Sequence, residues 1–181
     1  MSLVAGRAQV CTDAASGGVV RIAFANRPDV TDITVTAVTD VITAITMAST
    51  KIFYAYAHLK ETLRWTEKGT LTNNTELYEG EIRGFWTGFS PADRTAIRNM
   101  FKASRCGMVA IFELESGGTV LAGINVDKKT ATEKYFVELA EETIDSGAAI
   151  SDPNQREVIF RYRSSAPAAP FSPGWAGVPL T

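Results

Sequence analysis

Residues 30–47 read VTDITVTAVTDVITAITM, and this stretch decides the fold class. Apolar residues alternate almost strictly with threonine or aspartate, so an extended chain here has one apolar and one polar face. β-Branched side chains dominate the stretch, and these favour strands over helices because a helix restricts their χ1 rotation. The run is long for one strand, so it predicts either a bent strand or two short strands with a break near Thr39 and Asp40.

The same alternation, or a short apolar run bounded by turn residues, recurs along the chain. One apolar run follows Gly17 and Gly18 and is ended by the turn residues at 26–29. Residues 69–75 are polar and rich in turn formers, which is typical of the tip of a projecting hairpin. We expect about eight or nine strands in all. The others are expected at residues 51–60, 62–68, 76–88, 108–115, 119–126, 135–143 and 157–163.

One segment has the pattern of a helix. Residues 90–93 read SPAD, which places a serine at the N-cap, a proline at the first helical position and an acid at the third. Ile97, Met100 and Phe101 then recur at helical spacing, and the sequence predicts a helix over residues 91–104. With the strands on both sides of it, this indicates a mainly β fold: an antiparallel β-sandwich or barrel with one packed helix and extended termini.

The chain has 181 residues, which one hydrophobic core can serve. We expect a β-sandwich domain at residues 14–163, preceded by a flexible arm at residues 1–13. Residues 164–181 form a proline-rich extension in which regular secondary structure is not expected. This extension is either a disordered terminus or a segment that docks onto a neighbouring subunit. The side chains available for docking are Phe171, Trp175, Val178 and Leu180.

Composition and charge exclude several classes of protein. The net charge is −2 and the sequence pI is near 5.5, so no basic excess exists to hold nucleic acid or an anionic membrane. No signal peptide is recognised, and the longest apolar-looking stretch, residues 30–50, is too polar for a membrane span. Cys11 and Cys106 cannot supply the paired clusters of a zinc site. A disulfide between them is an alternative, but we favour a reducing compartment in which both cysteines are unreactive thiols.

No combination of residues points to catalysis or to a bound cofactor. His58 is the only histidine, and its place in an aromatic strand favours a structural role. Nucleophile, dinucleotide and phosphate-loop motifs are missing. Residues 145–154 resemble a calcium loop but lack its closing glutamate. We therefore expect no enzyme, no metal site and no cofactor.

The order of these features resembles a known family, the tail tube proteins of tailed bacteriophages. Residues 59–88 look like the family's strand, projecting hairpin and strand, and residues 91–104 look like the helix that packs against its sandwich. CGMVAIFELESGGTVLAGI (residues 106–124) resembles the hairpin that follows. SGAAISDPNQREVIFRYRSSAPAAPF (residues 146–171) resembles the closing turn, last strand and proline-containing end. The resemblance covers residues 14–171 and is one of pattern.

The resemblance implies a structural virion protein whose copies form hexameric rings, stacked into the tube through which the genome leaves the capsid. The expected partners are copies of the chain itself, other virion proteins and transiently passing DNA. The expected location is the virion tail, assembled in the host cytoplasm. It makes residues 69–75 an inter-subunit loop: Gly69, Thr70, Leu71, Thr72, Asn73, Asn74 and Thr75. The acids offered as lumen or ring contacts are Glu67, Glu76, Glu79 and Glu81.

Alternative functions stay open at this point. Residues 31–50 and the Trp175-containing tail are unusual for the family, so a tube terminator, a baseplate ring protein or a capsid-decorating (cement) protein is a second hypothesis. A carbohydrate-binding β-sandwich module is a third, and its aromatic stacking faces would be Tyr54, Tyr56, Trp65 and Trp86. A glycoside hydrolase that uses paired acids such as Glu113 and Glu115 is the least favoured.

Overall fold

Antiparallel strands make up most of the computed structural model, which describes residues 18–36, 39–58, 61–86, 90–126, 135–145 and 155–180. The mainly β fold class with one packed helix is confirmed. The strands are β1 (Val19–Asn26), β2 (Val30–Val35), β3 (Ile42–Met47), β4 (Tyr54–Tyr56), β5 (Arg64–Thr72), β6 (Thr75–Trp86), β7 (Met108–Leu114), β8 (Thr119–Ala122), β9 (Val137–Asp145), β10 (Gln155–Ser164) and β11 (Ala169–Pro170). The helices are α1 (Pro91–Ser104) and the 3-10 turns η1 (Arg27–Asp29) and η2 (Trp175–Gly177).

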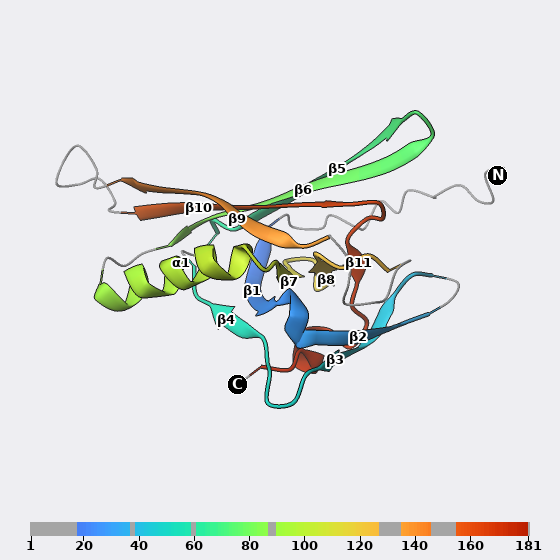
Figure 1. Ribbon diagram of the computed structural model, residues 1–181, viewed down its shortest axis with the longest axis horizontal. Coiled ribbons are helices and arrows are strands. Elements are labelled where there is room, and N and C mark those ends of the chain that lie inside the picture. Colours follow the sequence, from blue (N-terminus) through green and yellow to red (C-terminus); the bar gives the residue numbers. More distant parts are fainter. Residues whose placement is uncertain are drawn as a thin grey trace.

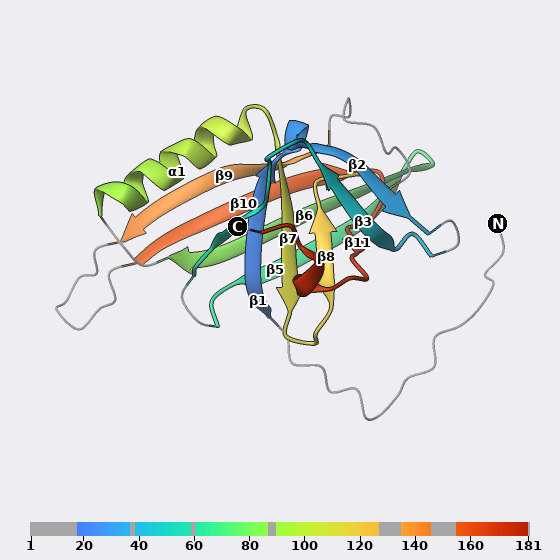
Figure 2. The same cartoon turned by 90° about the horizontal axis from the view of Figure 1, so that it is seen from below.

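The main sheet is folded into two layers. Strands β4, β1, β7, β8 and β11 form what we call the inner sheet, and β9, β10, β6 and β5 form the outer sheet. A single residue pair, Met108 with Val137, connects the two through β7 and β9. The strands of the inner sheet run steeply across those of the outer sheet (Figures 1 and 2), as in orthogonally packed sandwiches.

Two apolar clusters lie on opposite faces of the inner sheet. Phe112 of β7 belongs to the cluster shared with the outer sheet and α1, where Phe24 and Phe160 have ring centroids 4.5 Å apart. The neighbouring Ile111 points the other way, into a cluster with β2, β3 and the C-terminal segment. The inner sheet is therefore buried on both faces at β7 and β8, which explains the continuous apolar run in β7.

The decisive stretch at residues 30–47 forms two strands, as one of the two expectations had it. β2 and β3 pair antiparallel, with Ile33 opposite Ile45, and the chain reverses around Thr39 and Asp40. The expected strand at residues 51–60 is wrong for most of its length, because only Tyr54–Tyr56 pairs with β1. Its end, residues 59–60, lies outside the described residues.

The helix expected at residues 91–104 is confirmed, cap included. The backbone N–H of Asp93 donates to Ser90 Oγ at 3.2 Å, and the backbone N–H of Ser90 donates to Asp93 Oδ2 at 2.9 Å. The backbone N–H of Leu139 in β9 donates to Ser104 Oγ at 2.8 Å, so the helix end is fastened to the outer sheet. In the described part of the chain, no helix has the length and apolar character needed to cross a membrane.

The proline-rich C-terminal segment packs on its own chain. β11 pairs with β8 through Ala169 and Leu121, and the side chains of Phe171 and Val178 are buried in the second apolar cluster. The guanidinium of Arg21 lies over the Trp175 ring, 5.1 Å from its centroid. In this structure these candidates for docking onto a neighbour complete the chain's own core. Residues 1–13, the expected arm, lie outside the described residues, as does Cys11.

Candidate assembly surface of the outer sheet

The pleat of the outer sheet separates the four candidate acids. Side chains alternate between the faces of a strand, so Glu79 and Glu81 point to the solvent-exposed face of β6 while Gly80 and Ile82 point to the core. Glu67 lies opposite Gly80 and therefore belongs to the other face, and Glu76 has the same parity as Gly80. The structure brings Glu79 and Glu81 together and does not place Glu67 and Glu76 with them.

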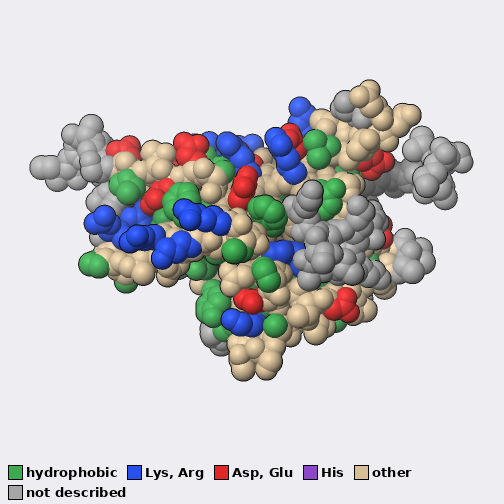
Figure 3. Space-filling view, viewed as in Figure 1, with side chains coloured by type: hydrophobic (Ala, Val, Ile, Leu, Met, Phe, Trp, Pro, Cys, Tyr) green, Lys and Arg blue, Asp and Glu red, His purple; other side chains and the backbone are tan. Residues whose placement is uncertain are grey.

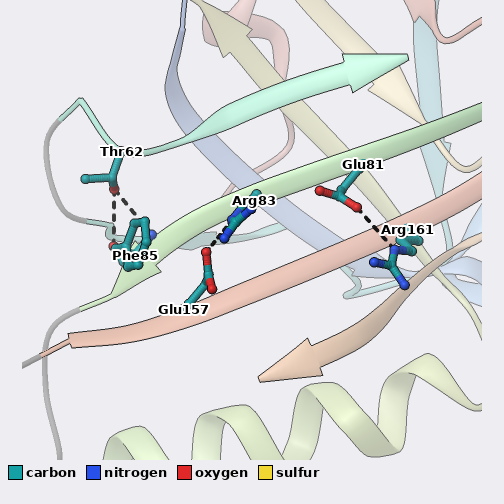
Figure 4. A network of polar contacts seen from close by, with 6 residues as sticks. All are labelled: Thr62, Glu81, Arg83, Phe85, Glu157 and Arg161. Atoms are coloured by element: carbon teal, nitrogen blue, oxygen red, sulfur yellow. Dashed lines mark hydrogen bonds and ion pairs between the residues drawn. The ribbon is translucent and has the colours of Figure 1, made fainter. Parts of the chain in front are cut away.

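Arginines from β10 pair with the two acids on the exposed face. Glu79 lies opposite Arg163 and Glu81 opposite Arg161, with Nε–Oε distances of 2.7 Å and 3.2 Å. Figure 4 shows Glu81 and Arg161 pointing toward one another across the two strands, beside a third ion pair between Arg83 and Glu157. The hydrogen bond to Glu157 raises the pKa of Arg83.

The exposed face is a mixture of charges. Its remaining charged side chains include Arg64 and Lys68 on β5 and Glu138 and Glu141 on β9. Because acids and bases alternate across the strands, the face carries no strong net field of either sign. An acidic lumen that repels DNA therefore finds little support at Glu79 and Glu81, whose charges are compensated.

Glu67 has a structural role that the sequence pattern did not reveal. Its Oε2 accepts hydrogen bonds from the Tyr162 hydroxyl at 2.8 Å and from the Ala168 backbone N–H at 2.9 Å. Trp65 Nε1–H donates in turn to the Tyr162 oxygen at 2.8 Å. Burial raises the pKa of Tyr162 far above its ordinary value, and the nearby Glu67 carboxylate adds to the shift. The network joins β5, β10 and the start of the C-terminal segment.

The hairpin tip at residues 69–75 projects as expected, but the expected seven-residue connection is wrong. β5 continues to Thr72 and β6 starts at Thr75, so only Asn73 and Asn74 form the turn, with φ of 51° and 61°. Two consecutive positive φ angles are typical of a type I′ hairpin turn, and asparagine tolerates them. Figure 1 shows this hairpin extending beyond the end of β10.

The tip also exposes apolar side chains. The last pair between β10 and β6 joins Ser164 and Tyr78, so the tip beyond it has no third strand. Leu71 is 70% exposed and Leu77 is 37% exposed there. Along its whole length β5 pairs only with β6 among the described strands. The outer sheet therefore combines an open edge, a projecting apolar tip and a hydrophilic face.

The aromatic residues considered for carbohydrate stacking are largely used by the fold. Trp86 stacks on Tyr56 with ring centroids 5.6 Å apart and planes 10° apart, and Trp65 packs on Phe112 at 5.1 Å. Tyr54 is exposed and stands alone among the four in that respect. These contacts leave no row of free aromatic faces among the four residues.

The surface of the described chain also has hollows, two of which are large enough to describe. One of about 750 Å³ is lined by the charged residues of the exposed face, including Lys68 and Arg163. The other, of about 1020 Å³, lies beside Trp175, Tyr56 and His58. Burial lowers the pKa of His58.

The residues considered for catalysis or metal binding are not assembled into a site within the described chain. Glu113 forms an ion pair with Arg21 at 2.6 Å, and Cys106 is an exposed free thiol. No cluster of three or more potential metal-binding side chains occurs in the described ranges. Of the suggested calcium loop, residues 146–154 lie outside them. No protein-family model, no curated protein and no solved structure matches the chain.

Proposed function

We propose that this protein is a structural virion subunit of the phage tail tube type. Its copies assemble into rings, six to a ring as the resemblance implies, and the rings stack into a conduit for genome delivery. Its partners are copies of itself and other virion proteins, and DNA passes it without sequence-specific contact. Its place is the virion tail, assembled in the host cytoplasm.

The observation that carries this proposal is the open edge of β5. This edge is nine residues long and has no partner strand in the described chain, so it presents a row of N–H and C=O groups that a second chain can pair. Arg64 and Lys68 stand on this edge strand, and charges at an edge oppose indiscriminate aggregation. Pairing is thereby restricted to a neighbour that complements them. Closing the outer sheets of several copies into a ring removes the open edges.

The exposed face of the outer sheet suits the wall of a channel. Its ion pairs, such as Glu79 with Arg163, leave few uncompensated cations for phosphates to bind. They also leave few uncompensated acids, so the wall neither binds nor strongly repels the polymer. This supports passage of DNA through charge balance in place of an acidic lumen.

The projecting hairpin suits contact between rings. Leu71 lies at the tip and is mostly exposed, where an isolated chain gains nothing from its burial. Burying it against the next ring stabilises stacking by the hydrophobic effect. The tip therefore acts in ring-to-ring contacts and the β5 edge in contacts within a ring.

The test is the assembly state of the purified full chain, measured by mass photometry and light scattering over a range of concentrations. The wild-type chain is expected to form rings or longer polymers. Leu71→Glu is expected to stop stacking at single rings, while Tyr54→Glu, an exposed change on β4 of the inner sheet, assembles like wild type. Rings of wild type that never stack would instead favour a terminator or decorating protein. Monomers at every concentration would refute the proposal.

A further inference from the structure

The exposed side of α1 carries a stripe of cations. Arg94, Arg98, Lys102 and Arg105 are all exposed and are spaced four, four and three residues apart. At about 100° per residue these four positions fall within about 80° of the helix circumference. Figure 3 shows Lys and Arg side chains gathered over α1. We call these four residues the α1 stripe.

No acid of the described residues compensates the α1 stripe. None of its four side chains forms an ion pair among the described residues, whereas Arg161 and Arg163 of the outer sheet both do. The single acid of α1, Asp93, is occupied by the cap on Ser90. Cations four residues apart repel one another on a helix, so the row does not stabilise α1 itself.

The helix dipole accounts for only half of the row. Lys102 and Arg105 lie at the C-terminal end, where the dipole favours positive charge. Arg94 lies in the first turn, where the dipole disfavours it, and Arg98 lies mid-helix. Nothing in the described part of the chain therefore stabilises the charges in the N-terminal half of the α1 stripe, which leaves them available to a partner.

The surroundings of the α1 stripe favour a protein partner over nucleic acid. Phe101 is 38% exposed and lies three residues after Arg98 and four before Arg105, which are neighbouring positions on a helix surface. Arginine beside an aromatic side chain is typical of protein interfaces. β9, which packs along α1, carries four acids and no base: Glu138, Glu141, Glu142 and Asp145. Acids on this neighbouring strand weaken the attraction of the stripe for a broad polyphosphate surface, whereas a narrow partner that contacts the stripe alone is less affected.

We propose that the α1 stripe docks an acidic α-helix of a second protein. A partner helix with a carboxylate at every fourth residue repeats at about 6 Å, which matches the spacing of Arg94, Arg98 and Lys102. A strand repeats its same-face side chains at about 6.6–6.8 Å, which matches this spacing less closely. An apolar side chain beside the carboxylates covers Phe101. This interaction goes beyond assembly into rings and does not depend on it.

The test uses the full chain and two synthetic helical peptides of identical composition. In the first peptide the glutamates recur every fourth residue beside a leucine, and in the second they are distributed around the helix. Calorimetry is expected to show the first peptide binding at least about tenfold more tightly than the second. Arg98→Glu with Lys102→Glu is expected to abolish this preference, and a lysine-striped peptide should then bind the double variant.

The matched control is Lys51→Glu, because Lys51 is an exposed cation that lies outside α1 and outside the surfaces proposed for assembly. This control is expected to bind the first peptide as wild type does. Arg98→Gln with Lys102→Gln replaces the charge reversal if the latter does not fold. Equal binding of both peptides, or binding of neither, would overturn the proposal. So would tighter binding of a short duplex DNA or of phosphatidylserine vesicles that is lost in the same variants.

Discussion

The two sheets of this protein are used in different ways. The inner sheet is covered on both faces, by the outer sheet and α1 on one side and by the β2–β3 hairpin and the C-terminal segment on the other. The outer sheet is covered on one face only, and β5 leaves one of its edges open. Stability is therefore concentrated in the inner sheet, while the outer sheet is available for contacts with other molecules. The following changes test this difference, from the largest expected effect to the smallest.

Removing a large side chain from the inner sheet has the largest expected effect. Phe112 is fully buried between the sheets, so Phe112→Ala loses its transfer free energy and leaves a cavity, a cost of about 3–5 kcal/mol. Leu77→Ala, on the outer hairpin, is expected to change the free energy of unfolding by about 0.5 kcal/mol or less. Urea denaturation of both variants measures the contrast. Comparable losses would contradict the division between the sheets.

A smaller loss of stability is expected from a change at Gly80, where the outer sheet packs on the core. A Cβ at Gly80 would overlap the ring of Tyr162, which bonds Glu67 and Trp65. Gly80→Ala is therefore expected to cost about 1–3 kcal/mol through overpacking. Gly118→Ala is the control, because its Cβ would meet only Leu114 Cδ1 at 3.9 Å. Thermal melting that ranks the two variants equally would show that the Tyr162 network is not under packing constraint.

Removing the N-terminal cap of α1 is expected to cause a moderate, pH-dependent loss of stability. Ser90→Ala removes the side-chain acceptor of the capping box and is expected to cost about 1 kcal/mol at neutral pH. The hydrogen bonds from Ser90 lower the pKa of Asp93, so the stabilisation is complete above the ordinary aspartate pKa and is lost as pH falls through the lowered value. The difference in unfolding free energy between wild type and Ser90→Ala should thus shrink in acid. The exposed helix change Asn99→Ala should show no such trend.

The smallest effect on stability is expected on the exposed face of the outer sheet. Arg163 and Glu79 are mostly solvated, so Arg163→Glu is expected to change the free energy of unfolding by about 0–1 kcal/mol. Because this face lines the proposed channel and lies outside both proposed contacts between copies, Arg163→Glu is also expected to assemble as wild type does. A large loss of stability, measured by urea denaturation, would contradict the small share of stability assigned to this face.

Local patterns predicted the fold class, and parity could have predicted more of the candidate site. The alternation at residues 30–47 and the helix cap at Ser90 depend only on residues close together in the sequence. The sequence alone therefore predicts both. The odd and even positions of Glu79 and Glu76 on one strand already place them on opposite faces. Asn73-Asn74 is likewise a local signal for a two-residue turn, and it lies inside the longer connection expected at residues 69–75.

Other features depend on residues far apart in the chain. The partners of Glu79 and Glu81 come from β10, and the oxygen that binds the Phe53 N–H belongs to Pro179. No local sequence pattern encodes such pairings. The shortness of β4 and the compensation of charges on the exposed face could therefore not be predicted from the sequence. The four-residue spacing of the α1 stripe is visible in the sequence. That its side chains form no ion pairs in the described chain is known only from the structure.

The central claim is that the outer sheet is completed by copies of the same chain. Cryo-electron microscopy of the purified full chain at high concentration tests it most directly. We expect closed rings in which β5 of each copy adjoins the outer sheet of the next, with the ion-paired face toward the central channel. Particles in which β5 remains at a free edge, or in which the copies meet through the inner sheet, would contradict the account.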